Sequence, residues 1–342
     1  MVSSSNPSVV TFGETMVRLS LPGHAHPALG APALGIGGAE SNVAISAARL
    51  GVDSTWLSVL GDDDFGDLVE REIRGQGVRV LARRDPVAPT GLLVKEFRGG
   101  RPSRVRYYRA GSAAAGMTAA DVDDAAAAAI AAAGVLHLTG ITPALGPGPT
   151  AAAHRAIEIA RAAGVPVSVD VNYRSSLWSA DRARPALLTL IRRADVLFAG
   201  SDEAALILDR PEPVDDIFLA AADLAAELTR LGPGQVVLKL GRHGALARRD
   251  GAIDEVPAYP VTVVDTVGAG DAFVGAYLAT LVRGQDVKAC LDAGARMGAL
   301  VCAAPGDWEG VLDWPGSFGP PPDPDRPDLG RPAHPHADDV RR

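Results

Sequence analysis

Cysteine and lysine are scarce in this 342-residue chain, and each scarcity argues against a class of protein. The two cysteines, Cys290 and Cys302, cannot build a disulfide framework or a metal cluster, so a reducing cytoplasm is the expected location. Only three lysines occur, and the net charge is −8. A protein that binds nucleic acid needs a basic surface for the backbone phosphates, so this class is not expected.

The sequence also has little that would direct it to a membrane. The opening stretch MVSSSNPSVVTFG lacks the charged region and apolar run of a signal peptide. The alanine-rich run at 123–134 is too short and too weakly apolar to span a bilayer, and it predicts a surface helix.

Short β-rich runs alternate with helical patterns, which predicts an α/β fold with a mostly parallel sheet and helices on both faces. With 47% hydrophobic and 22% charged residues, the composition is that of a globular enzyme. We expect one domain over 8–312. Strands are expected at 8–13, 54–61, 134–140, 166–172, 194–200 and 234–241, and helices at 39–51, 151–164 and 270–283.

Two segments depart from this alternation, and a third departs from globular composition. The stretches TMVRLSLPG and TGLLVKEFRGGRPSRVRYYRAG alternate apolar and polar residues, which predicts a small β-lid formed by about 14–36 and 90–112. Residues 313–342 are rich in proline and aspartate and have few large apolar side chains. Such a tail cannot offset its ordering entropy, so we expect it to be disordered.

The stretch DTVGAGDAFVGAY, at 265–277, combines small residues with one carboxylate at the start of an apolar helix. Gly268, Ala269 and Gly270 allow close approach of a ligand, and the first amides of a helix bind anions. Asp271 would repel an anion there unless it takes part in the chemistry. The alternative is an ordinary first-turn carboxylate that the helix dipole favours.

Other phosphate-binding motifs fit less well. The P-loop is absent, because no lysine is preceded by glycine and followed by serine or threonine. The stretch GIGGAE lacks the third glycine of the dinucleotide fingerprint, which leaves a Rossmann oxidoreductase as a weaker alternative. Protein-kinase and metalloprotease signatures are also missing.

DTVGAGDAFVGAY resembles the second signature of the PfkB, or ribokinase-like, carbohydrate kinases, and GGAESNVAISAARLG resembles their first. The likeness extends from about Val9 to Leu312. Within the family, GGAE, RVRYYRAGSA, VDVNYRSSLWS and GDWEG are most similar to 2-keto-3-deoxygluconate kinases. The resemblance implies a ribokinase-like fold in which Gly268, Ala269 and Gly270 hold the transferring phosphoryl group and Asp271 takes the proton from the sugar hydroxyl.

The same resemblance implies ATP and Mg²⁺ as cofactors. The nucleotide loop of the family is matched by Lys239, Gly241 and Gly244, although a plain strand-end turn also explains these two glycines. Gly268 and Gly270 would complete the nucleotide-binding site. Glu203 matches the position that orients magnesium, but Gly200 stands where the family has a polar residue three positions earlier. Asp265 and the 301–306 loop resemble a monovalent-cation site of some relatives.

Two arginines and a tyrosine suggest an acidic sugar. On a strand, Tyr107 and Arg109 share a face, and Arg174 follows VDVN at a strand end, where α/β sheets bind ligands. Guanidinium groups bind a carboxylate through paired, charge-assisted hydrogen bonds. The alternative is that they are surface arginines of an arginine-rich chain, and without the family resemblance this alternative is the better explanation.

By resemblance, the full set that contacts the sugar acid would be Gly38, Asn42, Tyr107, Arg109, Ile141, Arg174 and Asp307. Leu93 stands where those kinases tend to have tyrosine, which would relax substrate choice or weaken binding by about 1 kcal/mol.

We therefore predict phosphorylation of 2-keto-3-deoxygluconate by ATP to 2-keto-3-deoxy-6-phosphogluconate, in a homodimer or higher homo-oligomer that pairs through the lid. The alternatives are another PfkB kinase of the fructokinase or ribokinase type, and a non-catalytic protein that binds sugar or nucleotide. The epimer of the sugar acid is left open.

Overall fold

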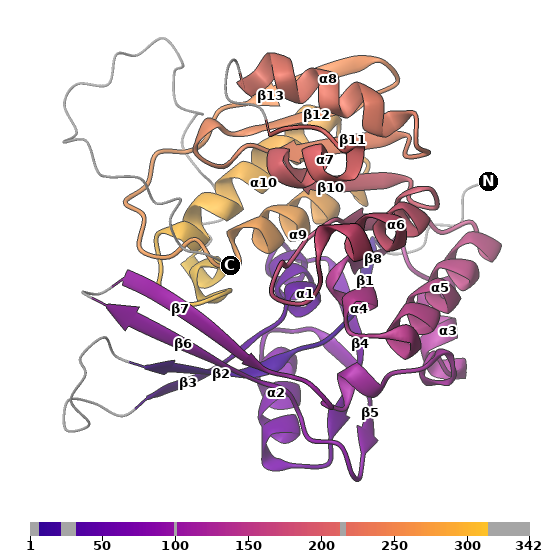
Figure 1. The fold of residues 1–342 in the computed structure, drawn as a ribbon, viewed down its shortest axis with the longest axis vertical. Helices are drawn as coiled ribbons and strands as arrows, with labels where there is room; N and C mark the ends of the chain where they lie inside the picture. Colours follow the sequence, from indigo (N-terminus) through magenta and orange to yellow (C-terminus); the bar gives the residue numbers. More distant parts are fainter. Residues whose placement is uncertain (1–6, 22–31, 99–100, 213–216, 314–342) are drawn as a thin grey trace.

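The computed structural model describes residues 7–21, 32–98, 101–212 and 217–313 (Figure 1). The predicted tail falls outside these ranges except for Asp313. Within them, no helix is long and apolar enough to cross a membrane.

The described residues form a nine-stranded main sheet in the order β13-β12-β11-β10-β9-β8-β1-β4-β5. The two pairings at the β13 end are antiparallel, and all the others are parallel. The mostly parallel sheet predicted from the sequence is thus confirmed. Its strands are β1 (Ser8–Phe12), β4 (Asp53–Gly61), β5 (Arg79–Asp85), β8 (Val135–Thr139), β9 (Val167–Asp170), β10 (Val196–Gly200), β11 (Gln235–Lys239), β12 (Ala245–Arg249) and β13 (Ala252–Val256).

Helices cover both faces of this sheet because its strands are apolar on both sides. Val9 packs in one core cluster and the adjacent Val10 in another, as strand alternation requires. One face holds α1 (Ala39–Arg49), α2 (Asp64–Gly75), α9 (Ala269–Leu281) and α10 (Val287–Cys302). The other holds α3 (Asp124–Ala131), α5 (Pro147–Ala162), α6 (Ala180–Ile191), α7 (Ser201–Leu208) and α8 (Ile217–Thr229), with the short α4 (Ile141–Ala144) nearby.

A smaller four-stranded sheet, which we call the lid, projects from one side of the described structure (Figure 1). Its order is β3 (Ala33–Gly37), β2 (Met16–Leu21), β6 (Leu92–Arg98) and β7 (Arg101–Tyr108). The β6–β7 and β2–β3 pairings are antiparallel, whereas β2 and β6 run parallel. The second sheet expected from the alternating patterns is therefore present, and the central pairing makes it a mixed sheet.

Helices α1 and α9 pack with their backbones unusually close. A Cβ atom added to Gly275 of α9 would lie 2.5 Å from the carbonyl oxygen of Val43 and 2.6 Å from Cβ of Ser46, both on α1. This contact brings the first turns of the two helices together, and those turns carry Asn42 and Asp271. Glycine at 275 is thus required by packing rather than by backbone conformation.

Gly275→Ala is expected to lower the free energy of unfolding by about 1–3 kcal/mol, because the new methyl group overpacks the α1–α9 contact. Urea unfolding followed by circular dichroism measures the change. The matched control is Gly75→Ala at the exposed end of α2, where no atom lies within 4 Å of the added Cβ. Better helix propensity should stabilise this control by up to about 1 kcal/mol. A Gly275 variant as stable as wild type would contradict the close packing.

Candidate active site

The carboxylate of Asp271 is buried at the start of α9 and accepts hydrogen bonds from two amide side chains. Asn42 Nδ2 on α1 donates to Oδ2 at 2.9 Å, and Asn172 Nδ2, just after β9, donates to Oδ1 at 3.3 Å. Asn172 adopts φ 42°, a left-handed conformation that asparagine tolerates. Sequence reasoning had not assigned Asn172, although its place at a strand's carboxyl end was a signal for a ligand site.

Burial raises the pKa of Asp271, because the charged form loses its hydration. The hydrogen bond from Asn42 and the positive charges of Arg174 and Lys239 act in the opposite direction. The net rise makes this carboxylate a better proton acceptor than a solvent-exposed aspartate.

The small residues before Asp271, which we call the cradle (residues 268–270), are the N-cap Gly268 and the first two residues of α9. Gly268 has φ 79°, and a Cβ atom there would overlap the carbonyl oxygen of Asp307. A Cβ atom at Gly270 would lie 3.5 Å from Nζ of Lys239. The cradle is therefore bounded by the backbone of Asp307 on one side and approached by an ammonium group on another.

Lys239, at the end of β11, pairs with Asp170 at the end of β9, with 2.6 Å between Nζ and Oδ2. Burial opposes the ammonium charge, but Asp170 and Glu203 outweigh it and raise the pKa of Lys239. Lys239 is therefore a permanent positive charge beside the cradle.

Glu203 lies in the first turn of α7 with both oxygens bound to backbone amides. The N–H of Tyr173 donates to Oε1 at 2.8 Å, and the N–H of Gly200 donates to Oε2 at 2.7 Å. The nearby Asp170 Oδ1 is buried and has no hydrogen-bond partner. Over the described ranges, no cluster of three His, Cys, Asp or Glu side chains could hold a metal by itself. This donor set fits Mg²⁺ that is bound chiefly by phosphates and water.

The two glycines of the expected nucleotide loop differ in their surroundings. Gly241 has φ 55°, and nothing lies within 4 Å of an added Cβ, so its surface is open to a ligand. At Gly244, with φ 111°, a Cβ would overlap the carbonyl oxygen of Val256. Packing against β13 thus requires glycine at 244. Of the two glycines, only Gly241 leaves space for a ligand to approach the backbone closely.

The two arginines expected to bind a sugar acid have different partners. Arg109 is buried and pairs with Glu14, its Nε donating to Oε2 at 2.6 Å, and Ser112 Oγ donates to the other oxygen of Glu14 at 2.6 Å. Arg174 donates to the carbonyl oxygen of Tyr173 at 3.2 Å and has no carboxylate partner in the described part of the chain. Sequence reasoning missed Glu14, which neutralises Arg109.

The remaining expected sugar contacts lie around the lid and the α1 terminus. Gly38 precedes α1, and a Cβ there would lie 2.5 Å from the carbonyl oxygen of Glu14. Ile141 is buried at the start of α4, and Asp307 is buried beside the cradle. Tyr107, on β7, is 38% exposed, and the Arg109 guanidinium lies 5.8 Å from its ring centre. None of these placements tests a role in binding.

A second carboxylate, that of Glu40 in the first turn of α1, is fully buried. Thr139 Oγ1 donates to Oε1 at 2.7 Å and Thr142 Oγ1 at 3.2 Å, while Oε2 has no partner. Burial is the main reason that the pKa of Glu40 rises to about 7, and the charge of Asp271 adds to the rise. Glu40 is the last residue of the GGAE stretch, but the sequence had suggested no role for its side chain.

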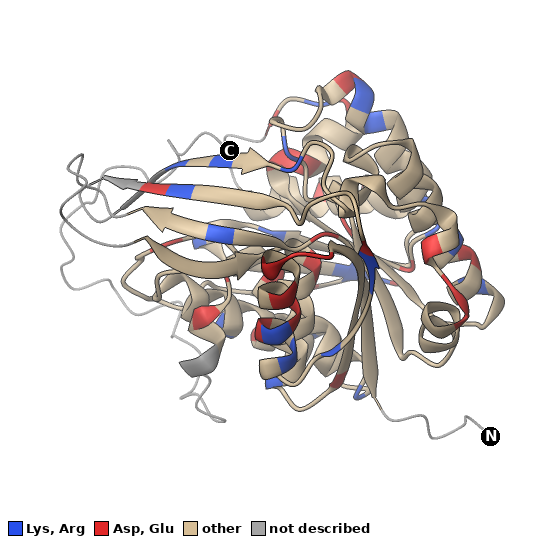
Figure 2. Cartoon of the chain, turned by 90° about the horizontal axis from the view of Figure 1, so that it is seen from below, with Lys and Arg blue, Asp and Glu red and all other residues tan. Residues whose placement is uncertain are grey.

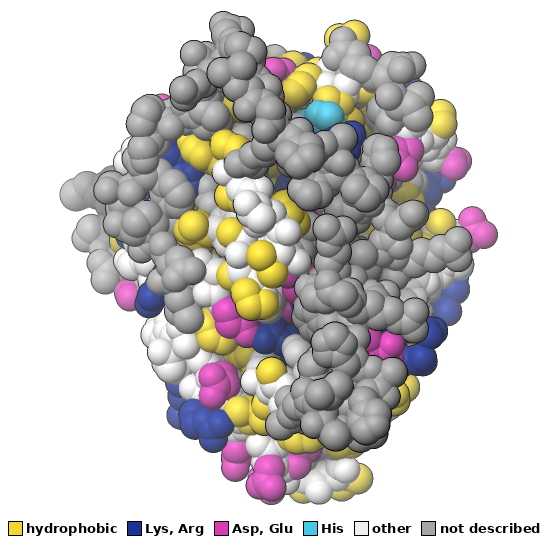
Figure 3. Space-filling model, turned by 90° about the vertical axis from the view of Figure 1, so that its left-hand side faces the viewer, with side chains coloured by type: hydrophobic (Ala, Val, Ile, Leu, Met, Phe, Trp, Pro, Cys, Tyr) yellow, Lys and Arg dark blue, Asp and Glu magenta, His cyan; other side chains and the backbone are white. Residues whose placement is uncertain are grey.

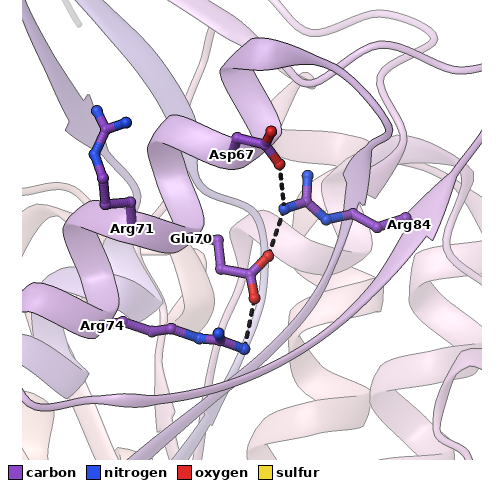
Figure 4. Close-up of a pocket in the computed structure, with 5 residues that line it drawn as sticks. All are labelled: Asp67, Glu70, Arg71, Arg74 and Arg84. Atoms are coloured by element: carbon purple, nitrogen blue, oxygen red, sulfur yellow. Dashed lines mark hydrogen bonds and ion pairs between the residues drawn. The ribbon is translucent and has the colours of Figure 1, made fainter.

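A separate surface hollow beside α2 and β5 does not belong to this site. Figure 4 shows Arg84 between Asp67 and Glu70, with Arg74 also paired to Glu70. Such exposed ion pairs neutralise one another and contribute little to stability.

Figure 2 also shows charges of both signs interspersed along the lid strands and neighbouring helices rather than gathered into one basic face among the residues it colours.

A mostly parallel α/β sheet with small residues at a helix start, a buried carboxylate and an adjacent ammonium is an arrangement that fits phosphoryl transfer. Residues 6–313 match the pfkB family carbohydrate kinase, and the chain belongs to this family. It is thus a carbohydrate kinase that transfers a phosphoryl group to an alcohol, as the sequence predicted.

Individual relatives are named for more than one sugar substrate. The chain is 38% identical to a 2-dehydro-3-deoxygalactonokinase of Haloferax volcanii, covering 87% of this chain and 92% of the relative. It is 35% identical to a 2-dehydro-3-deoxygluconokinase of Bacillus subtilis, covering 88% and 91%. A fructokinase of Oryza sativa is 34% identical, covering 80% and 83%.

Solved structures agree on the fold. A 2-dehydro-3-deoxygluconokinase from Thermotoga maritima has a TM-score of 0.80 at 29% identity, covering 90% of this chain and 97% of the other. A ribokinase-like protein from E. coli, solved with ATP and Mg²⁺, has a TM-score of 0.76 at 25% identity, covering 89% and 96%. The predicted ribokinase-like fold is confirmed.

Glu40→Gln should flatten the pH dependence of stability. Folding raises the pKa of Glu40 from an ordinary 4.5 to about 7. The stabilisation from its protonated carboxyl group is therefore fully present below about pH 4.5 and is lost as the pH rises to about 7. The free energy of unfolding of wild type should therefore fall, relative to the variant, by roughly 3 kcal/mol over this interval.

Urea unfolding at several pH values between 4 and 8 measures this difference. Only its change with pH reports on the pKa of Glu40, so a difference in the free energy of unfolding that is the same at every pH does not affect the test. The exposed Glu212→Gln serves as the control and should follow wild type. Parallel profiles for wild type and Glu40→Gln would contradict a raised pKa.

Proposed function

We propose that this kinase phosphorylates the terminal hydroxyl of 2-keto-3-deoxygluconate or its galactonate epimer, with Asp271 as the base. One observation carries the catalytic part: the buried Asp271 carboxylate directly follows the cradle and is oriented by Asn42 and Asn172. The two relatives with the highest identity quoted above, which are named for these sugar acids, support the substrate class.

In this proposal, the sugar hydroxyl attacks the γ-phosphorus of ATP while its proton passes to Asp271. The amides of the cradle and the ammonium of Lys239 stabilise the charge on the transferring group, and ADP leaves. Because the transition state is loose, orientation and charge stabilisation carry most of the rate. Bound Mg²⁺ would neutralise charge between the β- and γ-phosphates, with Asp170 and Glu203 in place to bind its water shell.

The charge balance of the two arginines favours an acidic substrate. Arg109 already has Glu14 as its counter-ion, whereas the Arg174 guanidinium is near enough to influence the pKa of Asp271 and lacks a carboxylate partner in the described structure. A substrate carboxylate would provide that partner. We therefore assign the acidic end of the sugar to Arg174, with Arg109 and Tyr107 beside it.

A neutral ketose is the second candidate, supported by two observations. The chain is similar to plant fructokinases, and Leu93, buried on β6, stands where, by resemblance, sugar-acid kinases tend to have a tyrosine. If Leu93 relaxes specificity, fructose would be turned over alongside the sugar acids.

The expected homodimer through the lid and the cytoplasmic location stay predictions. Leu34 on β3 and Tyr108 on β7 are 54% and 60% exposed, and Figure 3, viewed from the lid end, shows apolar side chains beside charges of both signs on the described part of this face. Such a surface fits pairing with a second copy.

Asp271→Asn should fold normally and lose about 10²–10⁴-fold in kcat, because the amide cannot accept the hydroxyl proton. Coupled detection of ADP measures turnover, and thermal unfolding checks the fold. Asp202→Asn, the same change at the exposed first turn of α7, should keep wild-type activity. If Asp271→Asn retained most of its activity, the carboxylate would be only a helix-terminus residue.

With both sugar acids, fructose and ribose offered side by side, the better sugar acid should exceed the neutral sugars about 100-fold in kcat/KM, or about 2.7 kcal/mol. Arg174→Ala should lower kcat/KM about 10- to 100-fold for the acid, since a charge-assisted bond is lost, and far less for fructose. The exposed Arg182→Ala on α6 is the control. Equal losses for both sugar types, or a preference for fructose in wild type, would contradict a carboxylate partner.

A further inference from the structure

A lysine of the lid reaches into the interior beside the cradle. Lys95, on β6, is 1% exposed. Its ammonium group pairs with Oδ2 of Asp265 and lies 3.1 Å from Oδ1 of Asp307. A lysine is almost never fully buried unless its charge is compensated, and here two buried carboxylates compensate it.

The two carboxylate residues lie on separate backbone segments that border the cradle. Asp265 Oδ1 accepts a hydrogen bond from the N–H of Val267 at 3.1 Å, which holds the turn that leads into Gly268. The carbonyl of Asp307 lies against Gly268 from the other side. Lys95 therefore connects the two backbone segments that enclose Gly268, and it does so from the lid.

A second cation from the lid completes this network. Arg18, on β2, lies 3.1 Å from Oδ1 of Asp307 and also pairs with Glu309. Glu309 in turn accepts the backbone N–H of Asp307 at 2.8 Å. Three carboxylates are thus gathered around two cations from adjacent lid strands, and loss of either cation would increase the excess of negative charge next to the proposed site for a phosphoryl group.

The groups that resemble a monovalent-cation site already have hydrogen-bond or ion-pair partners within the chain. Helix α10 extends through Cys302, so the segment expected as a loop begins only after it. The carbonyl of Cys302 accepts the N–H of Val264 at 2.8 Å and of Asp265 at 3.3 Å, and that of Val301 accepts the N–H of Ala304 at 3.2 Å. With Asp265 bound to Lys95 and Val267, these residues do not fit a separate K⁺ or Na⁺ at the Asp265 carboxylate.

We infer that Lys95 is a positioning residue that supplies, from within the chain, the positive charge that would otherwise come from a monovalent cation at Asp265. The kinase then needs no added K⁺ or Na⁺. Lys95 also couples the lid to the cradle, because displacement of β6 withdraws the ammonium from Asp265 and Asp307. The inference rests on the proposed role of the cradle in binding the transferring phosphoryl group.

The test compares wild type, Lys95→Ala and Lys95→Arg in KCl, NH₄Cl and choline chloride at equal ionic strength. Lys288→Ala, at an exposed lysine of α10, is the matched control. Wild type and the control should have the same kcat in all three salts. Lys95→Ala in choline should lose about tenfold or more in kcat, since small misplacements in an active site cost up to about 100-fold.

The decisive readout is rescue by a cation that fits the space left by the side chain. K⁺ or NH₄⁺ should recover most of the kcat lost in Lys95→Ala, and Lys95→Arg should retain activity in choline. A wild type activated severalfold by K⁺ would overturn the inference, and so would a Lys95→Ala variant that is fully active in choline or folded and not rescued. If Lys95→Ala does not fold, the wild-type salt series decides.

Thermal unfolding separates this inference from the proposed function. A cation that binds only the folded state raises the unfolding midpoint. K⁺ should therefore raise the midpoint of Lys95→Ala above its value in choline and leave wild type unchanged, whichever sugar is the substrate. A midpoint of wild type that rises specifically with K⁺ would show an additional cation site and overturn the inference. Absence of turnover on every sugar, with the midpoints as expected, would count against the proposed function alone.

Discussion

The structure around the candidate site depends on one constraint: the carboxylate of Asp271 is held out of water at the start of α9. A buried charge is costly unless hydrogen bonds and opposite charges compensate it. Here the compensation comes from Asn42 on α1, Asn172 after β9, and the nearby charges of Arg174 and Lys239. These groups lie in distant parts of the sequence, so the site exists only when the main sheet and both helices are assembled.

The close approach of α1 and α9 is the packing counterpart of this electrostatic requirement. Gly275 allows the two helix backbones to come within the reach of an asparagine side chain, so that Asn42 meets Asp271. A bulkier residue would separate the helices and lengthen the bond that orients the carboxylate. The packing of α1 against α9 therefore also sets how closely the Asn42 side chain approaches the Asp271 carboxylate.

Charge partners also explain why residues of one type take different roles. Arg109 and Arg174 were both expected to bind the sugar acid, yet Glu14 neutralises the first, and within the described residues the second donates only to a backbone carbonyl. Lys239 stays charged because Asp170 and Glu203 surround it, and it remains near enough to Gly270 to face an anion. Lys95 is instead enclosed by Asp265 and Asp307, which makes it part of the structural support of the cradle.

The sequence by itself determined the fold class, the second sheet and the position of the cradle, because these follow from strand and helix periodicity and from the local motif at 265–277. It also brought Asp271, Lys239 and Arg174 under consideration. Only the tertiary structure decided which charges meet: that Glu14 pairs with Arg109, that Asn172 reaches Asp271, and that the lid inserts Lys95 between two carboxylates. Periodicity reports which face of an element is buried, whereas the compensation of a buried charge is a contact between segments that no local pattern encodes.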